Sequence, residues 1–197
     1  MFIFVNFLKT QVNNMKTDAR VRYTVGVLKR SFLELLEQKP VNKISVKEVC
    51  ERAELNRATF YTHFNDCYDL LECIENDLIA DFCESLKYVN SVDVTKLIDA
   101  IYDMIERNTD VCRVLVFDNK GGSVIRKMID IAHDSSIESW RRELKNISDS
   151  ELEMLYTHLS NGLMHVVVEY YGKYDRETVI RFVSRMVRCS TDTFRRG

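Results

Sequence analysis

Pro40 is the only proline in a chain of 197 residues, and glycine occurs only six times. Sandwiches and barrels of β-strands need such residues at their many turns, whereas helix interiors exclude both. Leu, Glu, Lys and Met, which favour helix, are well represented. The sequence therefore predicts an all-α protein, and a hydrophobic content of 46% is enough to build a buried core.

Six cysteines are spread along the chain without a CxxC pair, so neither a zinc site nor a disulfide framework is indicated. We therefore expect a cytoplasmic protein without a metal or other cofactor. The apolar start MFIFVNFL lacks a basic beginning and a cleavage site, which makes it a poor signal peptide. Residues 1–14 could instead be an upstream extension, with Met15 as the true start. No other segment approaches the ~20 apolar residues of a membrane span.

Charge is distributed unevenly along the chain. Residues 15–64 carry ten Lys or Arg against six Asp or Glu, whereas residues 65–197 carry seventeen against twenty-four. A basic segment on an acidic remainder suggests that only the first part approaches a polyanion. We therefore expect two domains, a head at 15–64 and a body at 65–197.

The head contains the patterns of three helices. Apolar residues at three- and four-residue steps predict a first helix from about Asp18 to Gln38, which Pro40 ends. Ser45 and Glu48 have the spacing of a capping box, which opens a short second helix. The apolar faces of these helices can share one small core.

A third helix follows after a tight turn. Asn56 can cap it, and it runs to about His63 with Phe60 and Phe64 pointing inward. The opposite face then carries side chains suited to a major groove, because arginine reads guanine and small or methyl-bearing side chains fit against thymine. We expect these contacts from Arg57, Ala58, Tyr61 and Thr62, and phosphate contacts from Thr59, Tyr61 and His63. The alternative is an ordinary solvated helix face.

The segment ISVKEVCERAELNRATFYTHFNDCYDLL, residues 44–71, resembles the N-terminal helix-turn-helix of TetR family bacterial transcriptional regulators. ATFYTHF followed by DLL is its most specific part. The resemblance implies a recognition helix at 56–63, Lys47 facing DNA and a fourth helix from about Asp66. It also implies a homodimer on a palindromic operator, and one short helix reads too few base pairs to work alone. Most such proteins are repressors that a small-molecule effector releases.

Two positions depart from the family pattern. Glu54 stands where a turn glycine is usual, so we expect either a residue with a side chain in a left-handed conformation or a slightly different turn. Cys67 stands where a lysine commonly begins the fourth helix, which removes one phosphate contact. We therefore expect weaker or more salt-sensitive DNA binding.

The body predicts further helices at about 93–108, 109–117, 123–145, 149–171 and 175–195, with a turn at 118–122. It resembles, more weakly, a Firmicutes-type branch that includes regulators of dihydroxyacetone kinase operons. The resemblance rests on IYDMIERNTDVCRVLVFDNKG and HLSNGLMHVVVEYYGK. It implies that the last two helices pack against those of a second subunit. The residues expected at that interface, which could equally be intrachain core, are Tyr156, Leu159, Leu163, Val167, Phe182 and Met186.

An effector would bind between the helices of the body. Polar and aromatic residues that could line such a cavity are Tyr102, His133, Trp140, Tyr156, His158, Met164 and His165. His158 and His165 are seven residues apart, which does not suit a helical metal pair, and His133-Asp134-Ser135-Ser136 does not make a catalytic triad. We therefore expect no enzyme. Two alternatives stay open: a co-regulator that acts through another protein with little DNA affinity of its own, and redox sensing through Cys67 or Cys73.

Overall fold

The structure is a computed structural model that describes residues 19–89, 91–118 and 123–195. Regular structure in these ranges is helical, apart from one isolated bridge between Tyr171 and Tyr174, so the predicted all-α class is confirmed. The chain divides into two compact units that meet between Ala80 and Asp81. No helix in the described ranges has the length and apolar character needed to cross a membrane. The proposed extension at 1–14 lies outside the described residues.

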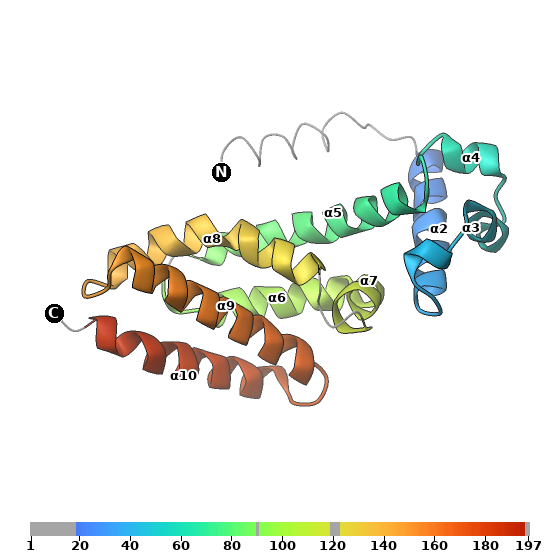
Figure 1. Ribbon diagram of the computed structural model, residues 1–197. Coiled ribbons are helices and arrows are strands. Elements are labelled where there is room, and N and C mark those ends of the chain that lie inside the picture. The colour runs from blue at the N-terminus through green and yellow to red at the C-terminus, as the bar shows by residue number, and fades with distance from the viewer. Residues whose placement is uncertain (1–18, 90, 119–122, 196–197) are drawn as a thin grey trace. The chain divides into compact units, whose positions relative to one another are not determined.

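The N-terminal unit contains four α-helices around one small core (Figure 1). They are α2 (Ala19–Leu36), α3 (Val46–Ala53), α4 (Arg57–Tyr61) and the first part of α5 (Cys67–Ser85), with a 3₁₀ turn η1 (Val41–Lys43) after Pro40. Each helix contributes fully buried side chains, which are Leu28, Phe32, Val49, Phe60 and Leu70. Apolar residues that recur at helical spacing in the sequence are thus buried together in one core.

Side-chain caps fix where the head helices begin. The Ser45 hydroxyl accepts from the backbone N–H of Glu48 at 3.3 Å, and the Glu48 carboxylate accepts from the N–H of Ser45 at 3.0 Å, which confirms the predicted capping box. The Lys39 ammonium also donates to Glu48 and, together with the Ser45 hydrogen bonds, lowers the pKa of Glu48 to about 2. Asn56 Oδ1 accepts from the N–H of Thr59 at 2.7 Å and caps α4 as predicted.

The turn between α3 and α4 uses a left-handed residue. Glu54 has φ 54° and ψ 37°, the αL conformation expected where the family has glycine. Its backbone N–H and that of Leu55 donate to carbonyls of the last turn of α3. The carbonyls of Cys50 and Glu51 are therefore satisfied despite the missing glycine, and α4 begins at Arg57.

The C-terminal unit consists of helices whose bounds lie within a few residues of those predicted (Figure 1). They are η2 (Leu86–Tyr88), α6 (Thr95–Arg107), α7 (Thr109–Cys112), the π-helical turns of η3 (Arg113–Asp118), α8 (Ser123–Glu143), α9 (Asp149–Tyr170) and α10 (Arg176–Arg195). Asp118, expected to start a turn, ends η3, and residues 119–122 lie outside the described part.

In the C-terminal unit α9 packs against both α8 and α10, and α10 also contacts α6. Arg176, at the start of α10, ties α10 to α6. Its guanidinium donates to Asp99 and Asp103 at 2.7 Å and lies 5.5 Å from the Tyr102 ring centre. Ser148 and Glu151 form a second capping box at the start of α9. These contacts hold the helices together around an interior that contains a cavity.

Candidate functional site

The short helix α4 has two opposite faces. Phe60 is fully buried, Phe64 is nearly so, and their ring centres are 5.8 Å apart. Arg57, Ala58, Tyr61 and Thr62 are exposed. Tyr61 is 58% accessible, although its ring is nearly perpendicular to that of Phe60 with the ring centres 5.6 Å apart. The core therefore orients α4, and the exposed face is a surface of one arginine, one tyrosine and two small side chains. We call these four residues the α4 face.

The threonine hydroxyls of α4 are already used within the helix. Thr59 Oγ1 donates to Asn56 Oδ1 at 3.0 Å, and Thr62 Oγ1 donates to the Thr59 carbonyl at 2.6 Å. Their protons are committed, so in this arrangement these hydroxyls can accept hydrogen bonds but not donate to a phosphate. Thr59 and His63 are both half-buried beside the exposed face.

Acidic neighbours neutralise several basic side chains of the N-terminal unit. Lys47 lies 3.6 Å from Glu51, one turn along the exposed side of α3. Further pairs are Lys29–Asp77, Lys39–Glu48 and Arg52–Glu34. Arg57 has no ion pair with any residue that the structure describes. Its charge is thus available to a partner at the start of α4.

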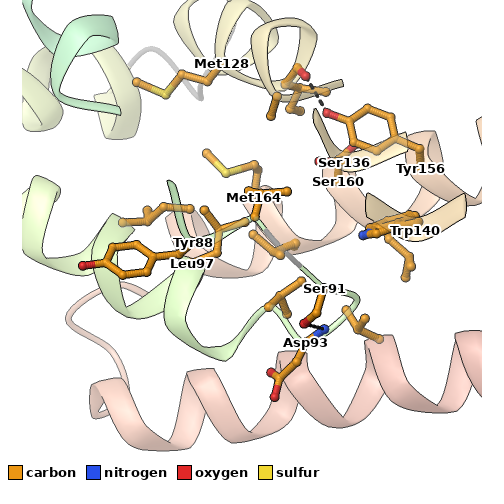
Figure 2. A pocket seen from close by; sticks show the side chains of 18 of the residues that line it. Tyr88, Ser91, Asp93, Leu97, Met128, Ser136, Trp140, Tyr156, Ser160 and Met164 are labelled. Atoms are coloured by element: carbon orange, nitrogen blue, oxygen red, sulfur yellow. Dashed lines mark hydrogen bonds between the residues drawn. The ribbon is translucent and has the colours of Figure 1, made fainter. Parts of the chain in front are cut away.

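The C-terminal unit encloses a cavity between α6, α8 and α9, with α10 and η2 at its edges. About 60 Å³ is available to the centres of water-sized molecules. Figure 2 shows Trp140 and Tyr156 on one side of this space and Tyr88 and Leu97 on the other. The lining is mostly aliphatic or aromatic, and its polar members are Tyr88, Ser91, Asp93, Ser136, Tyr156 and Ser160.

Three of the seven residues expected at an effector cavity are part of this lining: Trp140, Tyr156 and Met164. Tyr102 lies elsewhere, with its ring 5.5 Å from that of Tyr171. His158 and His165 are exposed on α9. Both histidines point away from the interior because they fall on the solvent side of the helix that carries Tyr156 and Met164 inward.

Sequence reasoning missed several lining residues that share a simple pattern. On α9, Ser160 and Leu163 lie at helical spacing from the expected Tyr156 and Met164, and on α8 Ala132 and Ser136 lie at helical spacing from the expected Trp140. A serine within an apolar helical stripe was the available signal, because a core position rarely needs a hydroxyl. Asp93 and Tyr88 had no such signal, since they lie in or next to irregular chain.

His133 lies behind the cavity wall between two carboxylates. Its Nε2 is 2.7 Å from Glu153 and its Nδ1 is 2.9 Å from Asp134. Its ring is perpendicular to that of Tyr156, with the ring centres 5.0 Å apart. The hydrogen bonds to Glu153 and Asp134 raise the pKa of the imidazole above its ordinary 6.5. Because Glu153 is on α9 and His133 on α8, the charged imidazole joins the two helices.

This arrangement predicts a pH-dependent contribution to stability. A histidine whose pKa is raised on folding stabilises the folded state fully below its unfolded pKa, and loses that contribution as pH rises through the folded pKa. The wild-type protein should therefore exceed His133→Gln in unfolding free energy at pH 5–6, with a difference that shrinks at alkaline pH. Denaturant unfolding of both proteins across this range measures it, and a difference independent of pH would refute the role of the charged imidazole.

Residues expected at a subunit interface differ in how far they are exposed. Tyr156, Leu159 and Val167 are buried by the chain's own helices and have no surface to offer a partner. Leu163 is half-buried and lines the cavity. Phe182 and Met186, one turn apart on α10, are 53% and 47% accessible. Phe182 borders a shallow groove that also includes Val166, Tyr170, Tyr174, Thr178 and Val179.

The cysteine environments do not favour redox sensing at Cys67. Burial raises the pKa of Cys67 to about 11, and burial also raises the pKa of neighbouring Cys50. Oxidation requires the thiolate, which such a pKa leaves scarce near neutral pH. Cys73 is half-buried. Among the residues that the structure describes, no His, Cys, Asp and Glu side chains gather in a group that could hold a metal ion.

Comparison with known proteins agrees with the geometry of the N-terminal unit. Residues 33–74 match the family described as "Bacterial regulatory proteins, tetR family". These residues form a TetR family N-terminal domain. The match spans the end of α2, all of α3 and α4, and the start of α5, so it includes the left-handed turn and the whole α4 face. No curated protein matches the chain.

Solved structures share the fold over most of the chain. "Dihydroxyacetone kinase operon activator DhaS" has a TM-score of 0.58 at 17% identity, covering 88% of this chain and 98% of that one. A transcriptional regulator described as TerR/AcrR family from Aquifex aeolicus VF5 has 0.54 at 21%, covering 86% and 98%. The fatty acid degradation regulator FadR from Bacillus halodurans has 0.57 at 13%, covering 88% and 96%. At identities this low, the structural similarity establishes a shared fold and nothing further.

Proposed function

We propose that this protein is a sequence-specific DNA-binding transcriptional regulator. The observation that carries the proposal is the α4 face: Arg57, Ala58, Tyr61 and Thr62 are exposed together because Phe60 and Phe64 hold the other side of the helix in the core. The match of residues 33–74 to the TetR family supports it. A helix so anchored presents its outer side chains to a major groove in one orientation.

Each residue then has a distinct role in DNA recognition. The Arg57 guanidinium donates to guanine O6 and N7, and the methyl groups of Ala58 and Thr62 contact thymine. Tyr61 donates its hydroxyl proton to a base edge or a phosphate. Thr59 and His63, at the border of the α4 face, and Lys47 on α3 contact phosphates. Lys47 must leave Glu51 to do so, which weakens its contribution.

The regulator acts as a homodimer on a palindromic operator. One five-residue recognition helix contacts too few base pairs for useful specificity, and a two-fold axis doubles the contacts. The exposed apolar surface of Phe182 and Met186, continuous with the groove of Tyr170 and Tyr174, is the face that a second copy would cover.

Replacing Phe182 with aspartate is expected to give a monomer. A carboxylate at the centre of an apolar interface loses its water without gaining a partner, which should weaken association at least a hundredfold. Sedimentation velocity at micromolar protein concentration measures the oligomeric state. Glu177→Asp, a conservative change at an exposed position five residues earlier on α10, serves as the control. A Phe182→Asp protein that sediments like the wild type would place the interface elsewhere.

Regulation is by repression that a small molecule relieves. The cavity of the C-terminal unit is the site for that effector, and its occupation would shift the population of conformers that fit the operator. The residues proposed to contact the effector are Trp140, Tyr156 and Met164.

Fluorescence anisotropy with DNA from upstream of the gene tests the proposal. The purified protein is titrated against this duplex and a scrambled duplex of equal length, at two salt concentrations. Nanomolar binding to the first duplex alone, with two protomers per site and an affinity that falls with salt, is the expected result.

An alternative function is a co-regulator that keeps the fold and acts through another protein. Two observations favour it: four basic side chains of the head are paired with acids, and Cys67 is buried where the resemblance would place a phosphate-binding lysine. The similar DhaS structure is described as an activator. Absence of binding to any duplex at low salt would favour this alternative.

A further inference from the structure

Almost all polar residues that line the cavity of the C-terminal unit are uncharged. Its described lining includes no Lys, Arg or His, and its one charged member is Asp93. A carboxylate or phosphate inside would lose its water and meet no cation, which is strongly unfavourable. The described walls therefore select against anions.

Asp93 does not make the cavity selective for cations. It is an exposed residue, and its carboxylate accepts from the backbone N–H of Thr95 at 2.9 Å and from its hydroxyl at 2.6 Å. These hydrogen bonds lower the pKa of Asp93, and the positive charges of Arg188 and Arg195 add to the effect. An ammonium group at Asp93 would thus compete with two guanidiniums outside the cavity.

The wall contains a buried hydroxyl at Ser160. Ser160 Oγ is buried and has no hydrogen-bond partner among the described residues. Burial raises the pKa of Tyr156, and hydrogen bonding by the nearby Ser160 hydroxyl partly offsets that rise. The Tyr156 hydroxyl donates its own proton to the Ile129 carbonyl at 2.5 Å (Figure 2), so it can only accept from Ser160. A buried hydroxyl is rarely left without a partner, so a group on a ligand is a natural match for it.

We propose that this cavity binds a small uncharged molecule, largely apolar, with one hydroxyl or carbonyl group that hydrogen-bonds to Ser160. The space, with about 60 Å³ open to the centres of water-sized molecules, is small and limits the ligand to at most a single ring or a short chain. The aromatic faces of Trp140 and Tyr156 suit a ring in particular. The inference rests on the proposed function in taking this molecule as the effector.

The chain itself supplies the reporter for a binding test. Trp140 is its only tryptophan and lines the cavity, so tryptophan emission of the full-length protein follows occupation of this site. Benzyl alcohol, benzoate and benzylammonium are probes of similar size and different charge. We expect a saturable change with benzyl alcohol and binding at least tenfold weaker for both ions. A charged probe that binds as well as the alcohol, or no saturable change with the alcohol, would overturn the proposal.

Ser160→Ala tests the polar contact. Loss of one neutral hydrogen bond should weaken the binding of benzyl alcohol about fivefold. The affinity for toluene, which has no hydroxyl, should stay unchanged. Ser150→Ala, the same change at an exposed position of α9, should alter neither probe. Toluene binding also reports that the variant is folded. An unchanged affinity for the alcohol, or an equal loss for both probes, would refute the role of Ser160.

These measurements use no DNA, which separates the ligand class from the proposed function. Adding benzyl alcohol to the anisotropy titration then tests regulation. Saturable probe binding by a protein that binds no duplex would leave the ligand class standing and remove the regulator. Specific DNA binding by a protein that does not bind the neutral probes would support the regulator and refute the ligand class.

Discussion

Replacing Arg57 and Tyr61 together with alanine is expected to lower affinity for the specific duplex by a hundredfold or more. Each side chain projects from the α4 face, and a good contact to a base edge contributes about 1–3 kcal/mol. Binding to a scrambled duplex should change far less, because phosphate contacts from the rest of the head remain. The same anisotropy titration measures both effects.

Controls separate recognition from charge and from folding. Arg107→Ala removes an equal charge from an exposed position of α6 and should leave DNA binding unchanged. Arg57→Lys keeps the charge but loses the bidentate geometry, so it should relax the choice of base at one position. Wild-type affinity in the double variant would show that the α4 face does not read DNA.

The second large effect is expected at Phe60. Its ring is fully buried beside Phe64, and truncation of such a side chain to alanine costs about 3–5 kcal/mol of unfolding free energy. Phe60→Ala should therefore unfold the N-terminal unit far more easily in denaturant and abolish DNA binding with it. Circular dichroism during denaturation measures this loss.

Tyr61→Ala is the matched control for Phe60→Ala. It removes an aromatic ring from the next position of the same helix, where more than half of the side chain is exposed. We expect it to cost less than about 1 kcal/mol. Equal destabilisation by the two variants would contradict the division of α4 into a core side and an exposed side.

The head could be predicted from the sequence because its signals are local. Ser45 with Glu48, and Asn56 with Thr59, are caps whose partners lie three residues apart, and Phe60 and Phe64 follow from helical spacing. For Glu54 the resemblance left two outcomes open, a left-handed residue or a different turn, and the structure has the first. The sequence did not reveal the ion pair between Lys47 and Glu51, although the two residues are four apart on a helix.

The body could be predicted only as a set of helices. Apolar periodicity places Tyr156, Leu159 and Val167 on inward faces of α9, but it cannot say whether the chain's own helices or a second subunit cover them. Burial answers this for the single chain, because α8 and α10 both pack on α9. The cavity likewise could not be predicted from the sequence, because its lining brings together residues as distant along the chain as Tyr88 and Met164.

Selection from a pool of random duplexes by the purified full-length protein tests the central claim most directly, because the pool contains every candidate half-site and no operator has to be chosen. We predict enrichment of a two-fold symmetric motif whose half-sites are centred about ten base pairs, or a multiple of this, apart. The Arg57→Lys protein should yield a motif altered at one position of each half-site. Recovery of no motif at low salt, or of the same motif with the Arg57→Ala/Tyr61→Ala protein, would contradict the reading of DNA by α4.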